Sequence, residues 1–119
     1  MSVPKEYYLK FLDVGNHGPY SWYKFPGNIK PGWKTPRIRK KIAMCSVGWH
    51  FTDLKNSNRW LRKKKYVVKP LGIMAWQQNK GVTSRLEFIG QIYEINESSI
   101  LKCIKKYEKL KKAGKLWKA

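Results

Sequence analysis

The chain has 119 residues, and its 26 Lys and Arg against 7 Asp and Glu give a formal net charge of +19 with both histidines neutral. This length predicts a single domain, and six Trp, seven Tyr and four Phe supply large apolar side chains that disordered chains lack. No apolar run approaches a membrane span of roughly 20 residues, the N-terminus lacks the apolar core of a secretory signal, and two cysteines exclude a disulfide framework. We therefore expect a cytoplasmic protein with reduced thiols.

The N-terminal third predicts one strand followed by a long packed loop. Residues 5–14 are aromatic and aliphatic without Gly or Pro, which favours a strand. Residues 15–36 contain four Gly and four Pro, so no regular element can run far. Several aromatic residues in this stretch favour an ordered loop over a flexible tail; they are Tyr20, Trp22, Tyr23, Phe25 and Trp33.

The middle of the chain predicts a short strand, a helix and a hairpin. Residues 42–54 begin as a strand that breaks at Gly48, and Asp53 is placed to cap a helix over residues 54–64. Helical spacing would put Leu54, Ser57, Trp60 and Leu61 on one face of that helix.

Two further strands, residues 66–76 and 86–95, flank the polar segment 77–84. Turn chemistry at Asn79–Gly81 predicts a hairpin, and Gly90 within the second strand predicts a bulge.

The C-terminal segment is the clearest helix. Asn96 is a candidate N-cap with Glu97 in the first turn, and Gly114 is placed to end the helix. Its apolar seam comprises Ile100, Cys103, Ile104, Tyr107 and Leu110. Together the elements predict a small α+β domain with a mainly antiparallel sheet: a core over residues 1–95, and a lysine-rich helix over 96–119 that packs on this core or extends from it.

The positive charge concentrates in three clusters, each beside aromatic residues. The loop cluster comprises Lys34, Arg37, Arg39, Lys40 and Lys41. The central cluster comprises Arg59, Arg62, Lys63, Lys64 and Lys65. The helix cluster comprises Lys102, Lys105, Lys106, Lys109 and Lys112, in a segment whose acidic residue is Glu108.

Clustered cations next to aromatic side chains are typical of nucleic-acid binding, because cations contact phosphates and aromatic faces stack on bases. The candidates for stacking are Trp33, Trp60 and Trp117. A lysine-rich helix face alone can be ordinary solvated surface, but such surfaces usually mix charge signs. A membrane surface is less favoured, since no cluster accompanies a strongly apolar helix face or a lipidation motif. Motifs for sequence readout are missing, so contacts to the phosphate backbone are expected.

Enzymatic and metal chemistry find little support. Cys45, His50, His17 and Cys103 do not have the spacing of a zinc site, and Cys45 with His50 lacks the signature of a nucleophile pair. Glu87 and Glu94 would face opposite sides of a regular strand, and no Gly-rich phosphate loop is present. We therefore expect neither an enzyme nor a cofactor.

The segment CSVGWH, Cys45–His50, resembles a Cys-x-x-Gly-aromatic-His motif in a family of small uncharacterised domains from bacteriophages and their hosts. The likeness extends over about the first 95 residues, through YLKFLDV, PYSWYKFPG, LKNSNRWL and the two later strands. It implies a phage-encoded α+β protein, with no settled activity. The lysine-rich helix from Asn96 onward departs from the family pattern.

Three functions follow as hypotheses. The first is a small basic protein that binds DNA or RNA through phosphates; which of the two it binds stays open. The second is a phage-encoded inhibitor that docks on a host nucleic-acid machine by protein contact. The third is a structural component of a ribonucleoprotein particle.

Overall fold

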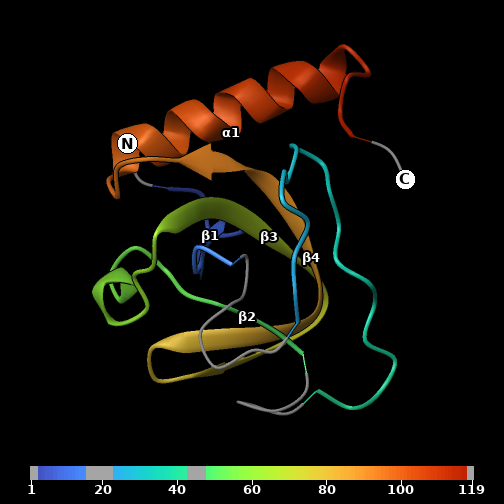
Figure 1. Cartoon of the computed structure of the whole chain (residues 1–119), viewed down its shortest axis with the longest axis vertical. Helices are drawn as coiled ribbons and strands as arrows, with labels where there is room; N and C mark the ends of the chain where they lie inside the picture. The colour runs from blue at the N-terminus through green and yellow to red at the C-terminus, as the bar shows by residue number, and fades with distance from the viewer. Residues whose placement is uncertain (1–2, 16–22, 43–47, 118–119) are drawn as a thin grey trace.

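The computed structural model describes residues 3–15, 23–42 and 48–117. It contains β1 (Tyr8–Leu12), β2 (Trp49–Phe51), a 3-10 turn η1 (Ser57–Arg59), β3 (Lys64–Gln77), β4 (Lys80–Ile92) and α1 (Glu97–Lys112). The strands form one antiparallel sheet in the order β1-β3-β4-β2, with α1 lying across it (Figure 1). The predicted α+β class is confirmed. Within the described residues, no helix is long and apolar enough to span a bilayer.

The sheet curls because its long hairpin carries two irregularities. The register shifts between Val67 and Val68, where Gly90 and Phe88 are their successive partners, so the bulge predicted at Gly90 is confirmed. A second shift lies between Leu71 and Met74. Bulges increase the twist of a sheet. In this curled sheet the two edge strands, β1 and β2, come next to each other.

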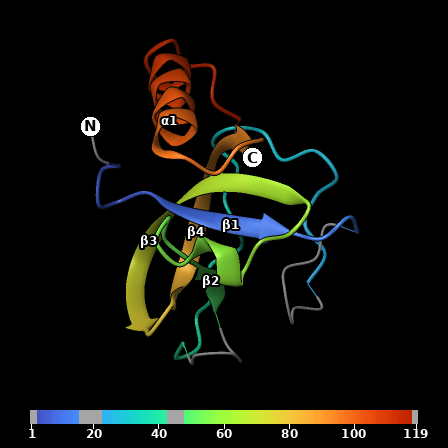
Figure 2. The same ribbon diagram turned by 90° about the vertical axis from the view of Figure 1, so that its left-hand side faces the viewer.

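Backbone hydrogen bonds join the edge strand β1 to the residue that follows the other edge strand, β2. The Leu9 amide donates to the Thr52 carbonyl at 2.7 Å, and the Thr52 amide donates to the Leu9 carbonyl at 2.8 Å. Figure 2 shows β1 crossing the molecule with β3 curling around it.

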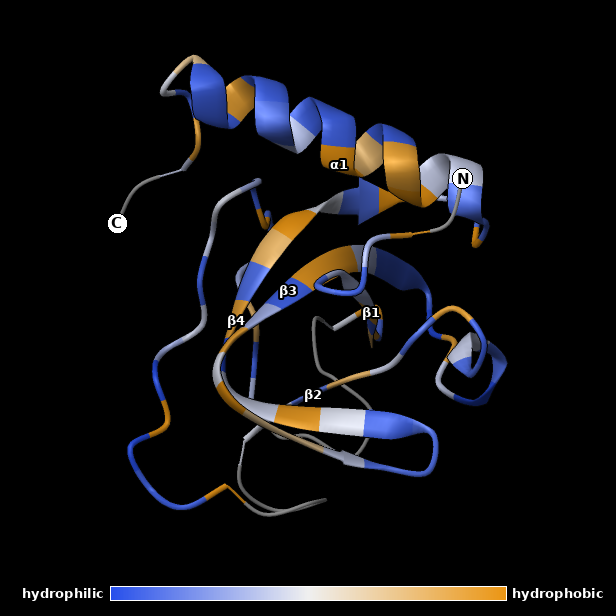
Figure 3. Cartoon of the chain, turned by 180° about the vertical axis from the view of Figure 1, so that it is seen from behind, coloured by the Kyte–Doolittle hydropathy of each residue, from blue (hydrophilic) through white to orange (hydrophobic). Residues whose placement is uncertain are grey.

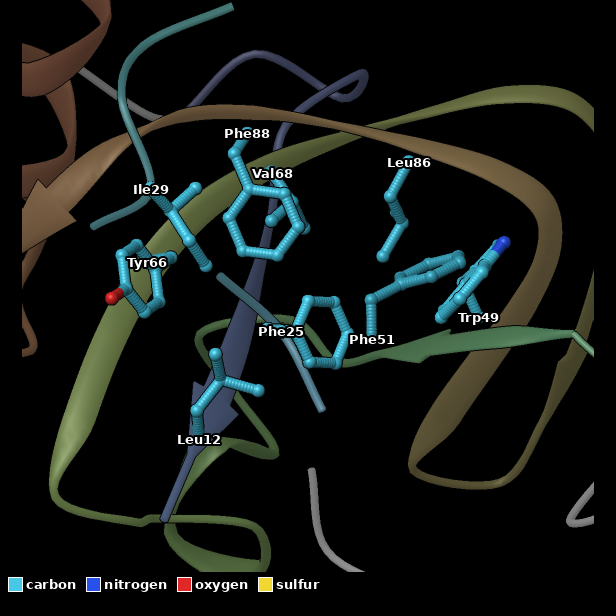
Figure 4. Packing of buried hydrophobic residues seen from close by; sticks show 9 residues of the cluster. All are labelled: Leu12, Phe25, Ile29, Trp49, Phe51, Tyr66, Val68, Leu86 and Phe88. Carbon is cyan, nitrogen blue, oxygen red and sulfur yellow. The ribbon is translucent and has the colours of Figure 1, made fainter. Parts of the chain in front are cut away.

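One apolar core lies inside the curled sheet. Phe25 enters it from the loop, which confirms the predicted packing of this segment for Tyr23, Phe25 and Trp33; Tyr20 and Trp22 lie outside the described residues. Figure 4 shows the Phe25 ring among side chains from all four strands. The cluster comprises Leu12, Phe25, Ile29, Trp49, Phe51, Tyr66, Val68, Leu86 and Phe88.

A second core lies between the sheet and α1. Ile100, Ile104 and Tyr107 are buried there with Leu9 and Phe11 of β1. Packing is close where α1 crosses β4, since a Cβ on Gly90 would lie 2.7 Å from Cys103 Sγ.

Both ends of α1 were predicted and are confirmed. Asn96 Oδ1 accepts the Ser99 amide at 2.8 Å. Gly114 has a φ of +69° and follows the C-cap, and the Lys115 amide donates to the Leu110 carbonyl at 2.8 Å, a geometry that ends a helix.

The middle of the chain departs from the prediction at the helix. The short strand predicted before Gly48 falls on residues 43–47, which lie outside the described part; β2 begins at Trp49, directly after this glycine. The helix over 54–64 is replaced by η1. Asp53 Oδ1 does accept the Asn56 amide at 2.9 Å, but the Ser57 hydroxyl bonds back to Leu54 at 2.8 Å. Such local side-chain bonds compete with helix propagation.

Candidate nucleic-acid interface

The helix cluster forms a single stripe on the outer face of α1. At 100° per residue, its five lysines fall within an arc of about 120° opposite the buried seam. All five are exposed. From Lys102 to Lys112 the stripe extends about 15 Å along the axis. In Figure 3 the side of α1 turned toward the sheet carries the hydrophobic bands, and the outer side is hydrophilic.

This stripe lacks neutralising partners. Among the described residues, the ion pairs are Lys34 with Glu87 at 3.9 Å and Arg62 with Asp13 at 3.3 Å, and neither involves the helix cluster. Glu108 is exposed on the same helix but forms no ion pair with its lysines in the described structure. The lysines of the stripe therefore have no directly paired carboxylate among the described residues.

The loop cluster lies beside β4. The Thr35 amide donates to the Leu86 carbonyl at 2.9 Å, and the Ile38 amide donates to Ser84 at 2.8 Å, so this segment follows the strand edge. Arg37 Nη1 reaches the bulge, where a Cβ on Gly72 would lie 3.3 Å from it. All five cations of this cluster are exposed.

The central cluster lies on the opposite flank. Arg59 is the last residue of η1 and the other members follow it; Lys64 and Lys65 are half-buried where β3 pairs with the end of β1. In Figure 1 this region is green at the left while segment 34–41 is teal at the right, and Figure 2 places the two at different depths. The structure therefore does not bring the three clusters onto one face.

A buried carboxylate connects α1 to the loop cluster. Glu87 accepts the Tyr107 hydroxyl at 2.6 Å and lies 3.9 Å from Lys34 Nζ. Burial, followed by the hydrogen bond to this carboxylate, raises the pKa of Tyr107. Sequence reasoning missed the pair, although a tyrosine within the apolar seam and an acid within an apolar strand were the available signals.

The predicted stacking tryptophans have different environments. Trp33 packs its ring 5.5 Å from Phe88 in the inner core. The Trp60 indole donates to the Asn79 carbonyl at 3.1 Å, and Lys80 Nζ lies 5.0 Å from its ring centroid. Neither ring is presented as an open platform.

Trp117 lies in the tail beyond the helix cluster. Its amide donates to the Pro31 carbonyl at 2.9 Å, and its side chain is 38% exposed. Of the three candidates, it is the one that belongs to the exposed large hydrophobic side chains, and it lies next to the loop at Pro31. Trp76, near the end of β3, is also 40% exposed.

Of the residues considered for nucleophilic or metal chemistry, the structure describes His50 and Cys103. Cys45 and His17 lie outside the described residues. Burial raises the pKa of Cys103 to about 11, which keeps its thiol protonated. Burial, with the charges of Lys10 and Lys80, lowers the pKa of His50 to about 4. In the described part of the chain, no three metal-binding side chains gather.

No family model, curated protein or solved structure matches this chain. The resemblance at Cys45–His50 stays a prediction, and the function has to be inferred from the geometry of the chain itself.

Proposed function

We propose that this protein binds nucleic acid through the phosphate backbone, with the helix cluster as the principal contact. The observation that carries the proposal is the stripe of five exposed lysines without a carboxylate partner in the described structure. Cations that face a polyanion release condensed counterions on binding, whereas cations already paired with acids contribute less. We also propose, from the resemblance alone, a phage-encoded protein that acts in the host cytoplasm.

The dimensions of the stripe suit a nucleic-acid strand. A length of about 15 Å corresponds to roughly four nucleotides at 3.4 Å of axial rise per strand. The seam that anchors the opposite face of α1 holds the lysines in register. The exposed ring of Trp117, in the tail that follows α1, would add stacking on an unpaired base.

The alternative is that the stripe is only solvated surface. Solvated helix faces usually intersperse both charge signs, which limits repulsion. Here one outer face carries five lysines in a chain whose net charge is already +19. A polyanionic partner would relieve the repulsion between these positive charges.

Fluorescence anisotropy with labelled duplex DNA, single-stranded DNA and RNA tests the proposal across salt concentrations. If the five lysines neutralise five phosphates, affinity should fall about 500-fold between 50 and 200 mM salt. Converting all five to glutamine should flatten most of this dependence, because each lysine contributes about one unit to the slope.

A charge-matched control separates a placed interface from bulk charge. Five exposed cations elsewhere, Lys24, Arg39, Lys40, Lys55 and Lys63, are changed to glutamine together. The control should retain most of the salt dependence. Equal loss in both variants, or a nearly flat response in the unmodified protein, would refute the helix cluster as the interface.

A further inference from the structure

The outer edge of β3 is unpaired over its second half. β1 pairs with β3 only from Lys64 to Val68, whereas β4 pairs with it as far as Gln77. The chain before β1 turns away, since the Tyr7 amide donates to the Pro4 carbonyl at 3.2 Å. Within the described residues, no other backbone bonds to β3 beyond Val68 on this side.

This edge is apolar and exposed. Ile73 is 74% exposed, and Met74 and Trp76 are also among the exposed large hydrophobic residues. Natural sheets usually protect such edges with charged side chains, yet residues 70–79 contain no charged residue in this highly charged chain. After the bulge, Ile73–Gln77 provides about 17 Å of strand, the usual length of one strand in a sheet.

The charges at the ends of this segment indicate the kind of partner. Lys69 and Lys80 bound the uncharged stretch in the sequence; Lys80 Nζ lies over the Trp60 ring, and Arg37 Nη1 lies beside Gly72. A strand with acidic residues at its ends would complement them. A second copy would bring two chains of charge +19 together, and residues 70–79 themselves offer a nucleic acid no cation.

We infer that the edge of β3 from Ile73 to Gln77 binds an extended, acid-flanked segment of a partner protein, which adds a strand to the sheet. Main-chain hydrogen bonds supply affinity in such complexes, and side chains on alternate sides supply selectivity. Ile73 and Met74 would contact the added strand from opposite faces. This site is separate from the helix cluster and does not depend on nucleic-acid binding.

The test is an NMR titration of the full chain with a capped peptide in which five alternating valine and threonine residues lie between pairs of glutamates. Amide shifts should saturate and concentrate at Ile73–Gln77. N-methylation of alternate peptide amides should abolish the shifts, and lysine in place of glutamate should weaken binding. If N-methylation leaves the shifts in place, or if the lysine peptide binds as tightly as the glutamate peptide, strand addition by an acid-flanked segment is refuted.

Ile73→Glu supplies the protein variant and Val14→Glu its control, because the two side chains have similar exposure, 74% and 70%, and the charge change is identical. We expect peptide binding about tenfold weaker for I73E, from the lost apolar contact and like-charge repulsion, and unchanged for V14E. Both variants should bind nucleic acid like the unmodified protein.

Shifts confined to the lysines of α1, or no shift at millimolar peptide, would overturn the inference. Shifts at Ile73–Gln77 that grow with protein concentration alone, accompanied by a dimer in sedimentation, would assign the edge to a second copy and also overturn it.

Discussion

Lys10 places an amine inside the curled sheet, and its replacement by methionine tests how much stability the burial of this amine costs. β1 alternates, so Lys10 lies on the same side as the core residue Leu12. It is 7% exposed, and Nζ donates to the His50 carbonyl at 2.7 Å. Nζ also lies 5.5 Å from the centroid of Phe25. Burial lowers the pKa of Lys10 from 10.5 to about 8.

The magnitude follows from this difference in pKa. Each pKa unit corresponds to about 1.4 kcal/mol, so the buried ammonium costs about 3 kcal/mol of stability below pH 8. Lys10→Met removes this cost and retains most of the apolar stem. It also removes the hydrogen bond from Lys10 Nζ to the His50 carbonyl, at about 1 to 2 kcal/mol. We therefore expect K10M to be more stable by about 1 to 2 kcal/mol at pH 6.5.

The pH dependence has a definite sign. Because the folded pKa of Lys10 lies below its ordinary value, the unfolded chain binds more protons between pH 8 and 10.5. The stability of the unmodified protein therefore rises relative to K10M across this window. By pH 10.5 the advantage of K10M should have disappeared, because the neutral amine still donates to the His50 carbonyl.

Urea denaturation of both proteins from pH 6.5 to 10.5 measures the difference between their free energies of unfolding. Titration of the groups that the two proteins share cancels in this difference. Lys24→Met, at an exposed position, is the control and should give a small difference without this pH dependence. A difference that stays constant from pH 7 to 10.5, or a K10M variant less stable at pH 6.5, would refute the reasoning.

Three further substitutions test other contacts by thermal or urea denaturation. Tyr107→Phe should cost about 1 to 3 kcal/mol, because the buried Glu87 carboxylate loses its 2.6 Å donor; an unchanged stability would contradict this. Asn96→Ala should cost about 1 kcal/mol through loss of the N-cap, with a matching decrease in helical circular dichroism. Gly48→Ala should destabilise more than either, since φ is +125° and the new Cβ would lie 2.4 Å from Val82 Cγ2; a folded, equally stable variant would show that this strand can shift.

Features set by neighbouring residues were predictable from the sequence. α1 was predicted with both ends, because its N-cap, apolar seam and terminal glycine act within one or two turns. The β3–β4 hairpin was also predicted, although its strands begin earlier and its turn is tighter than expected. The bulge at Gly90 was predicted because glycine in a strand commonly marks one.

Features set by distant parts of the chain were not predictable in the same way. The capping residue Asp53 was identified correctly, but the helix it should begin yields to local hydrogen bonds and to the early start of β3. The partnership of Tyr107 with Glu87 depends on where α1 crosses β4. The exposure of Ile73 and Trp76 depends on where β1 stops pairing with β3.

The placement of charge has a consequence for how partners are arranged. The molecule measures 36 × 31 × 27 Å, and the loop and central clusters lie on opposite flanks, so one straight duplex resting on α1 cannot contact all three clusters. The flanking cations then act at longer range, where they steer association and are screened by salt within about 10 Å.

The free edge of β3 lies at the end of the sheet away from α1 (Figure 1). A nucleic acid on the helix cluster and a protein strand on that edge would therefore occupy opposite ends of the molecule, and neither would block the other. If the two proposals hold, the protein links a nucleic acid to a protein partner, and a ternary complex in sedimentation with both ligands would be the expected result; mutually exclusive binding would contradict this arrangement.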